Sequence, residues 1–151
     1  MEIEEIKEKL NPKNFMNPYN SEKIARANEL MERLLNSGLR YAEFLVIKKN
    51  TEELYNNIAW GYCLQKKYNE ALPYSLKAIE LNPEHGYSWE TLGELYFYLG
   101  QYEKCIDAMT KCIACNDDKQ YKDAYEMRGK SYLKIGKTKE GKRDINKAKE
   151  M

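Results

Sequence analysis

The feature that most constrains this chain is an internal repeat with a period of 34 residues. The segments that begin at Tyr68 and at Tyr102 align without a gap, and each has small residues at the same two offsets after the aromatic one. The halves that precede them agree too, because Tyr62 falls 34 residues before Tyr96. A repeat of this length predicts a solenoid, in which each unit buries its apolar surface against its neighbours.

Three units follow from this pattern: residues 52–85, 86–119 and 122–151. The proline at position 83 closes the first unit, since proline has no amide donor with which to continue a helix. Small residues recur at repeat positions 8, 20 and 27, where they allow paired helices to approach closely. They are Ala59, Gly93 and Gly129, then Ala71, Cys105 and Gly141, then Ala78, Cys112 and Ala148.

At these residues the chain resembles the tetratricopeptide-repeat family, whose unit is a 34-residue helix-turn-helix. The resemblance covers about two thirds of the chain. It implies an all-α fold, a right-handed α-α superhelical solenoid of helix-turn-helix repeats. The third unit departs most from the family pattern, because Arg128 and Thr138 stand where the family has leucine and an aromatic residue. Its lysine-rich second helix, Thr138 to Lys149, is expected to act as a polar C-terminal cap.

The sequence upstream of the three units is less regular. Residues 20–51 predict two helices, the second from Leu39 to Lys49, and we interpret them as a degenerate first repeat or an N-terminal cap. Residues 1–19 predict a short amphipathic helix and a linker. Homodimerisation through the apolar side of that helix stays open; its apolar residues are Ile3, Ile6 and Leu10.

Composition narrows the classes of partner and the compartment. The 25 basic and 24 acidic side chains nearly cancel, so no net field attracts the chain to nucleic acid or to a membrane. The charges are nevertheless uneven, since residues 122–150 hold ten basic and five acidic side chains. An acidic N-terminal segment, the lack of an apolar run of 18 residues and four cysteines indicate a cytoplasmic protein without disulfides.

Little in the sequence predicts catalysis, a metal or a cofactor. The single histidine, His85, falls in a turn between units, and nothing in the sequence places a nucleophile or a carboxylate beside it, so we expect a surface turn residue. The pair Cys112-x-x-Cys115 has the spacing of a redox or metal motif but lacks a second pair of ligands. Because Cys105 and Cys112 occupy small-residue positions of the repeat, these thiols are expected to pack in the core.

The resemblance also implies where a partner binds, because the first helices of stacked units build the concave surface of a solenoid. In the family this groove is lined by repeat positions 2, 5, 6, 9, 12 and 13. The residues at these positions that we predict to bind a partner are Glu53, Asn56, Asn57, Trp60, Tyr87, Glu90, Glu94, Phe97, Tyr98, Asp123 and Glu126. Their acidic and aromatic character predicts a basic or amphipathic peptide or protein surface as the partner.

The leading functional hypothesis is therefore a scaffold, an adaptor or a partner that sequesters another protein. One subclass of the family grips the C-terminal carboxylate of chaperones with lysine and arginine, but Tyr87 and Thr91 stand at two of those positions, so chaperone-tail binding is not expected. Two alternatives from other classes stay open. One is a nucleic-acid accessory protein that uses the basic C-terminal helix, and the other is a thiol-dependent enzyme.

Overall fold

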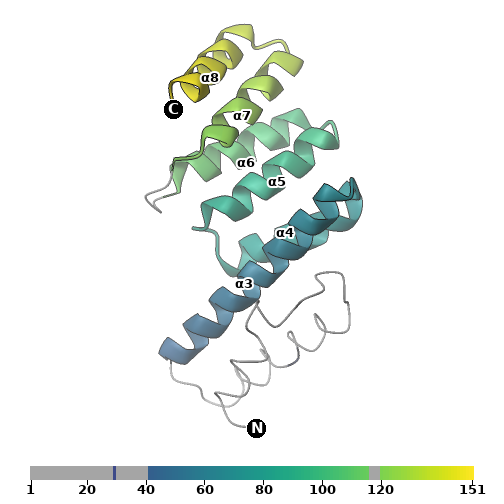
Figure 1. Cartoon of the computed structure of the whole chain (residues 1–151), viewed down its shortest axis with the longest axis vertical. Coiled ribbons are helices and arrows are strands. Elements are labelled where there is room, and N and C mark those ends of the chain that lie inside the picture. The colour runs from purple at the N-terminus through teal and green to yellow at the C-terminus, as the bar shows by residue number, and fades with distance from the viewer. Residues whose placement is uncertain (1–28, 30–40, 116–119) are drawn as a thin grey trace.

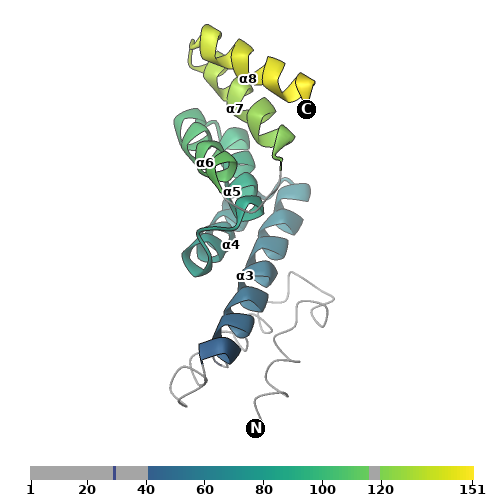
Figure 2. The ribbon, with the colours of Figure 1, turned by 90° about the vertical axis from the view of Figure 1, so that its left-hand side faces the viewer.

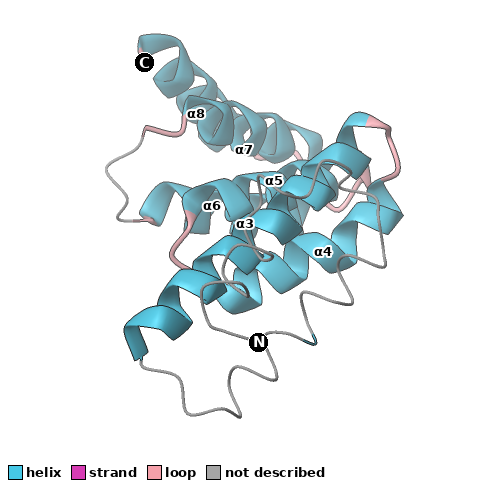
Figure 3. Ribbon diagram, turned by 60° about the horizontal axis from the view of Figure 1, so that its bottom comes forward, coloured by secondary structure: helices cyan, strands magenta, loops and turns pink. Residues whose placement is uncertain are grey.

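The computed structural model describes Glu29, residues 41–115 and residues 120–151 of the chain. Within these residues the structure contains six helices and no strand (Figures 1 and 3). The helices are α3 (Tyr41–Leu64), α4 (Tyr68–Leu81), α5 (Gly86–Tyr98), α6 (Tyr102–Ala114), α7 (Lys122–Lys134) and α8 (Thr138–Glu150). The predicted all-α class is confirmed.

The helices pack as three successive pairs: α3 with α4, α5 with α6, and α7 with α8. Between pairs, the first helices contact one another, α3 with α5 and α5 with α7. The second helices α4, α6 and α8 make no such contact with each other, and each lies beside the first helix of the following pair where there is one. The pairs therefore stack into an elongated solenoid whose first helices share one face, as the two perpendicular views show (Figures 1 and 2).

The turn inside each pair ends the first helix in the same way three times. An amide N–H after the turn donates to a tyrosine carbonyl five residues back: Lys67 to Tyr62 at 2.9 Å, Gln101 to Tyr96 at 2.8 Å and Lys137 to Tyr132 at 2.8 Å. This bond belongs to a helix ending that needs one residue with positive φ. Gly100 (φ 76°) and Gly136 (φ 83°) fill that position in two turns, whereas Lys66 (φ 59°) fills it in the first.

Small residues set the distance between paired helices, and α7 with α8 shows this most directly. A Cβ atom added at Gly129 would lie 2.9 Å from the carbonyl oxygen of Gly141, and one added at Gly141 would lie 2.8 Å from the carbonyl oxygen of Gly129. Backbone atoms cannot give way as a side chain can, so a larger residue at either position would force the helices apart. The predicted close approach at repeat positions 8 and 20 is confirmed here.

The N-terminal part of the described fold differs from the sequence prediction. The helix expected from Leu39 to Lys49 is not a separate element, because α3 runs without a break from Tyr41 to Leu64. The sequence across residues 49–52 contains no glycine or proline to end a helix, and Thr51 and Glu52 are buried within it. The helix expected in residues 1–19 and the first of the two helices expected in residues 20–51 lie, apart from Glu29, outside the described residues.

In the third pair, an ion pair replaces apolar contact. The guanidinium of Arg128, on α7, donates to both carboxylate oxygens of Asp144, on α8, at 2.6 and 2.9 Å. A third bond of 3.1 Å links it to the hydroxyl of Thr110. The departure of position 128 from leucine is therefore compensated by a buried acid on the facing helix, with the Asp144 side chain 3% exposed.

Candidate functional site

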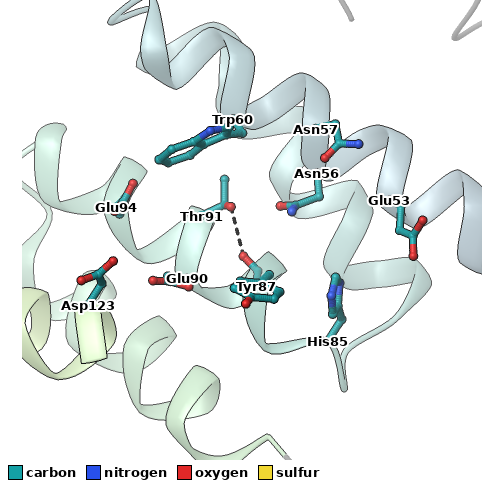
Figure 4. A pocket seen from close by; sticks show the side chains of 10 residues that line it. All are labelled: Glu53, Asn56, Asn57, Trp60, His85, Tyr87, Glu90, Thr91, Glu94 and Asp123. Atoms are coloured by element: carbon teal, nitrogen blue, oxygen red, sulfur yellow. Dashed lines mark hydrogen bonds between the residues drawn. The ribbon is translucent and has the colours of Figure 1, made fainter. Parts of the chain in front are cut away.

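A pocket of about 470 Å³ opens on the face shared by the first helices (Figure 4). Helix α3 contributes four residues to it at helical spacing, α5 contributes four at the same spacing, and α7 contributes one from its first turn. The lining residues are Glu53, Asn56, Asn57, Trp60, His85, Tyr87, Glu90, Thr91, Glu94 and Asp123. Spacing of three, four and seven residues places side chains on one side of a helix, so two neighbouring helices suffice to build both walls.

The structure brings together eight of the eleven residues predicted from the repeat positions, all of them in the pocket lining. Phe97, Tyr98 and Glu126 lie outside it. Phe97 packs against the buried cluster of Cys105, Met109 and Cys112 and contacts the Tyr102 ring edge-on. Phe97 therefore packs against the neighbouring helix and is not part of the pocket wall.

The two other residues outside the pocket have partners of their own. The ring of Tyr98 stacks on that of Tyr68, with centroids 5.0 Å apart and planes within 13°. Glu126 forms an ion pair with Lys130 one turn along α7, at 2.8 Å. Both side chains remain at the surface, but neither faces the space enclosed by α3 and α5.

One end of the pocket is acidic. Glu90 and Glu94 project from α5, and Asp123 projects from α7 beside them (Figure 4). Burial, followed by the negative charges of Asp123 and Glu94, raises the pKa of Glu90 to about 7. Burial and Asp123 also raise the pKa of the Glu94 carboxyl. Their negative charges repel one another, and within the described residues no ion pair joins any of these three carboxylates to a cation.

The pocket also presents aromatic surface and amides. Trp60 is 42% exposed and Tyr87 is 46% exposed, unusually high fractions for such large side chains. Asn56 and Asn57 line the wall opposite Glu90. The carboxamide oxygen of Asn56 is buried and has no hydrogen-bond partner, although a buried acceptor is normally satisfied.

His85 corrects the prediction from sequence. Its ring is not simply solvated, because the Nδ1 atom lies 2.5 Å from a carboxylate oxygen of Glu52. The Glu52 side chain is itself buried, with 1% of its surface exposed. The buried hydroxyl of Ser88 donates to that same carboxylate oxygen at 2.6 Å. These residues tie the start of α5 to the middle of α3, at the edge of the pocket.

A serine, a histidine and a glutamate in contact invite comparison with a hydrolase triad, but the geometry is different. In a triad the acid and the serine bind opposite nitrogens of the imidazole. Here the Ser88 hydroxyl lies 3.2 Å from Nδ1, the same nitrogen that faces Glu52, and the serine is fully buried. The cluster therefore holds two helices together rather than activating a nucleophile.

The cysteines behave as core residues. Cys63, Cys105 and Cys112 are buried, and no disulfide joins any of the four. Burial, with a smaller effect of Glu94, raises the pKa of Cys63 to about 11, and burial raises that of Cys105 to a similar value. A thiol that stays protonated at neutral pH is a poor nucleophile. Among the described residues, no three His, Cys, Asp or Glu side chains are placed to hold a metal ion.

Across the part of the chain that the structure describes, every helix is too short or too polar to cross a bilayer.

Paired helices that stack through their first members, with a pocket on that face, define a helical solenoid repeat protein. Comparison with protein families then gives the kind of repeat. Two models of the tetratricopeptide repeat match the sequence, one over residues 52–85 and one over residues 74–107. The chain is a tetratricopeptide-repeat protein.

Solved structures agree on the fold. The second repeat domain of Spaghetti (RPAP3), bound to the HSP90 peptide SRMEEVD, superposes with a TM-score of 0.62 at 20% identity, covering 66% of this chain and 91% of that one. MamA superposes with a TM-score of 0.60 at 22% identity, covering 84% and 77% of the two chains. No curated protein matches the sequence. At these identities the likeness shows the fold, and the repeats support a protein-interaction module.

Proposed function

We propose that this chain is a non-enzymatic interaction module that binds a basic or amphipathic peptide, or a protein surface of that kind, in the pocket between α3, α5 and α7. It would act as a scaffold, an adaptor or a sequestering partner. The observation that carries the proposal is the meeting of Glu90, Glu94 and Asp123, which lack an ion-pair partner in the described structure, with the exposed rings of Trp60 and Tyr87. Exposed aromatic residues supply the apolar contacts that dominate binding, and uncompensated acids select cations.

The structural neighbour with a bound peptide sharpens the proposal by contrast. That peptide, SRMEEVD, carries three acidic side chains. In this chain Tyr87 and Thr91 stand where chaperone-tail binders have cations, and the surrounding pocket is acidic. An acidic peptide would be repelled, so we propose the same face of the fold with the opposite charge preference.

A peptide-display selection against the immobilised full chain tests this directly. Peptides enriched by the wild type should be rich in lysine, arginine and aromatic residues, and SRMEEVD should show no measurable binding. The affinity of an enriched peptide should fall roughly tenfold or more when the salt rises from 0.05 to 0.3 M, because the contacts are electrostatic. The double variant Trp60→Ala/Glu94→Lys should lose binding.

The matched control is Glu103→Lys, the same charge reversal at an exposed position of α6 remote from the pocket. It should bind as the wild type does. Circular dichroism of both variants separates a lost site from a lost fold. Enrichment of acidic peptides, or equal binding by the double variant, would refute the proposal.

A second candidate function rests on α8. Its exposed cations are Lys139, Lys142, Arg143, Lys147 and Lys149. Such a row can neutralise phosphates, but no exposed aromatic ring is interleaved with it to stack on bases. Gel-shift titration at 0.15 M salt, with Lys142→Ala/Arg143→Ala as the comparison, decides between this role and the pocket.

The proposal includes a cytoplasmic location. Its support is the placement of Cys63, Cys105 and Cys112 as buried thiols. At two of these positions the repeat needs a small residue, and a reducing compartment preserves thiols in that form.

A further inference from the structure

The acidic end of the pocket presents mainly hydrogen-bond acceptors, which restricts the chemistry of the ligand that can bind there. The carboxylates of Glu90, Glu94 and Asp123 can only accept hydrogen bonds when ionised, and the carboxamide oxygen of Asn56 is an acceptor without a partner. The Thr91 hydroxyl donates to the Tyr87 carbonyl of its own helix at 3.0 Å, so it is already used as a donor. A complementary ligand brings several donors and a positive charge.

A metal ion does not fit this description. Among the described residues no set of three acidic or other ligating side chains converges closely enough to hold one. The three acids instead border one end of a space of about 470 Å³, and the indole of Trp60 bounds that space on one side (Figure 4). That arrangement suits a polyatomic cation that spans several acceptors and lies against an aromatic face.

We infer that the pocket receives one arginine side chain of the partner, with its guanidinium against Trp60 and its N–H groups on the acidic end. This inference rests on the proposed function and names the chemistry of its ligand. A guanidinium is planar, has five donors and no acceptor, and is weakly hydrated, so it stacks on an indole and loses little on entering a half-buried site. A lysine ammonium offers a single strongly hydrated charge that cannot reach several walls at once.

The inference carries a proton linkage. The free pocket holds Glu90 with a pKa of about 7, whereas a guanidinium keeps its charge at every relevant pH. Binding therefore favours the ionised carboxyl, lowers its pKa and releases a proton. The affinity should rise by about tenfold between pH 5.5 and pH 8.

Other titratable groups face Glu90 across the pocket: Glu53 from α3, His85 before α5, Glu94 and Tyr87 on α5, and Asp123 on α7. The variant Glu90→Gln separates Glu90 from these groups, because it should flatten the profile if Glu90 is the linked group. An undiminished profile in that variant would overturn the linkage to Glu90.

The affinity test uses the blocked peptide acetyl-Ala-Ala-Arg-Ala-Ala-amide and its lysine and citrulline analogues, with the full chain. The protein has two tryptophans, Trp60 in the pocket and Trp89, whose indole N–H donates to the Pro83 carbonyl at 2.7 Å outside it. Indole N–H signals in ¹⁵N-resolved NMR, assigned with Trp89→Phe, therefore report the site and an internal control. The arginine peptide should shift the Trp60 signal saturably and leave that of Trp89 in place.

Lysine should bind about tenfold more weakly than arginine, and neutral citrulline should not bind measurably. Asp123→Asn should weaken arginine binding several-fold, whereas Asp107→Asn, on the exposed side of α6, should not. Equal binding of lysine, binding of citrulline or an unmoved Trp60 signal would overturn the inference. The display selection can still succeed in that event, since basic peptides can bind the face without this pocket contact, so the two failures are distinguishable.

Discussion

Two regions of this solenoid enclose carboxylates in opposite ways. In the last pair, Asp144 lies between α7 and α8 and receives two N–H bonds from Arg128. In the pocket, Glu90 and Glu94 face Asp123, and no described cation forms an ion pair with any of the three. The pKa values of both glutamates are raised. Among the described residues, a counter-charge accompanies the acid that serves packing, and none forms an ion pair with the acids that face the cavity. This difference separates a structural acid from one that is available to a partner.

Asp144→Ala gives the largest expected effect. It leaves the guanidinium of Arg128 without its counter-charge in a largely enclosed position between helices, since the Arg128 side chain is 13% exposed. The free energy of unfolding should fall by about 3–5 kcal/mol, measured by urea denaturation.

The double variant Arg128→Leu/Asp144→Ala is the control for that loss. Leucine at position 128 restores the residue type found at the equivalent Leu92, so the double variant should regain most of the stability, to within roughly 1 kcal/mol of the wild type. If Asp144→Ala alone is as stable as the wild type, the ion pair does not stabilise the fold, and Asp144 cannot be contrasted with the pocket acids as a structural acid.

Glu52→Ala should rank second. The substitution removes the acceptor for the Ser88 hydroxyl and the partner of His85, and it leaves both polar groups at a buried helix junction. We expect a loss of about 2 kcal/mol in the free energy of unfolding. The neighbouring Glu53→Ala, whose side chain faces the pocket instead, should change it by less than about 0.5 kcal/mol. Equal losses in the two variants would contradict the assignment of Glu52 to packing.

The contact between Glu52 and His85 shows where sequence reasoning stopped short. The repeat period predicted the helix pairs and the small residues between them, because these follow from local composition. The contact joins residues 33 apart, nearly one period, so the end of a unit lies over its own beginning. The spacing could have indicated that these two residues lie close together. The repeat pattern, however, does not specify which side chains stand at the unit boundaries.

The pocket was predictable from sequence as far as it depends on helical spacing, but not where contacts with neighbouring helices decide the position of a side chain. Helical spacing fixes which residues of α3 and α5 share a face, so Trp60 and Glu94 could be placed together from sequence alone. Phe97 and Tyr98 also stand at groove positions of the repeat, near the end of α5. The ring of Phe97 nevertheless contacts Tyr102, and the ring of Tyr98 contacts Tyr68. Those contacts depend on which residues α4 and α6 place beside the end of α5, and the repeat positions of α5 alone do not predict this.

Glu90→Gln tests the other side of the comparison. The folded protein binds the Glu90 proton more tightly than the unfolded chain does, since the folded pKa is about 7 and the ordinary value is 4.5. The contribution of this group to stability is therefore greatest below pH 4.5 and is lost as the pH rises toward 7. At pH 8 the neutral glutamine should stabilise the protein by about 1–2 kcal/mol, discounted for the partial exposure of the site.

Urea denaturation at pH 5 and at pH 8 measures the effect of Glu90→Gln. The gain at pH 8 should exceed the gain at pH 5, because the wild-type carboxyl is largely protonated at the lower pH. A variant that is destabilised at pH 8 would mean that the ionised carboxylate has a partner within the free chain. The pocket acids would then belong with Asp144, and the argument for an external cation would lose its basis.

Glu126→Gln is expected to have the smallest effect and marks the boundary of the comparison. Its carboxylate accepts a bond from Lys130 at 2.8 Å, but the two side chains are 43% and 48% exposed. Lys130 lowers the pKa of Glu126, yet solvent screens a pair this exposed, and we expect a change in stability below about 0.5 kcal/mol. Binding of the arginine peptide should also be unchanged, because Glu126 lies outside the pocket and already has a cation. A clear loss of affinity would mean that the site extends along α7. An acid with an ion-pair partner could then still bind an external cation when solvent screens that pair.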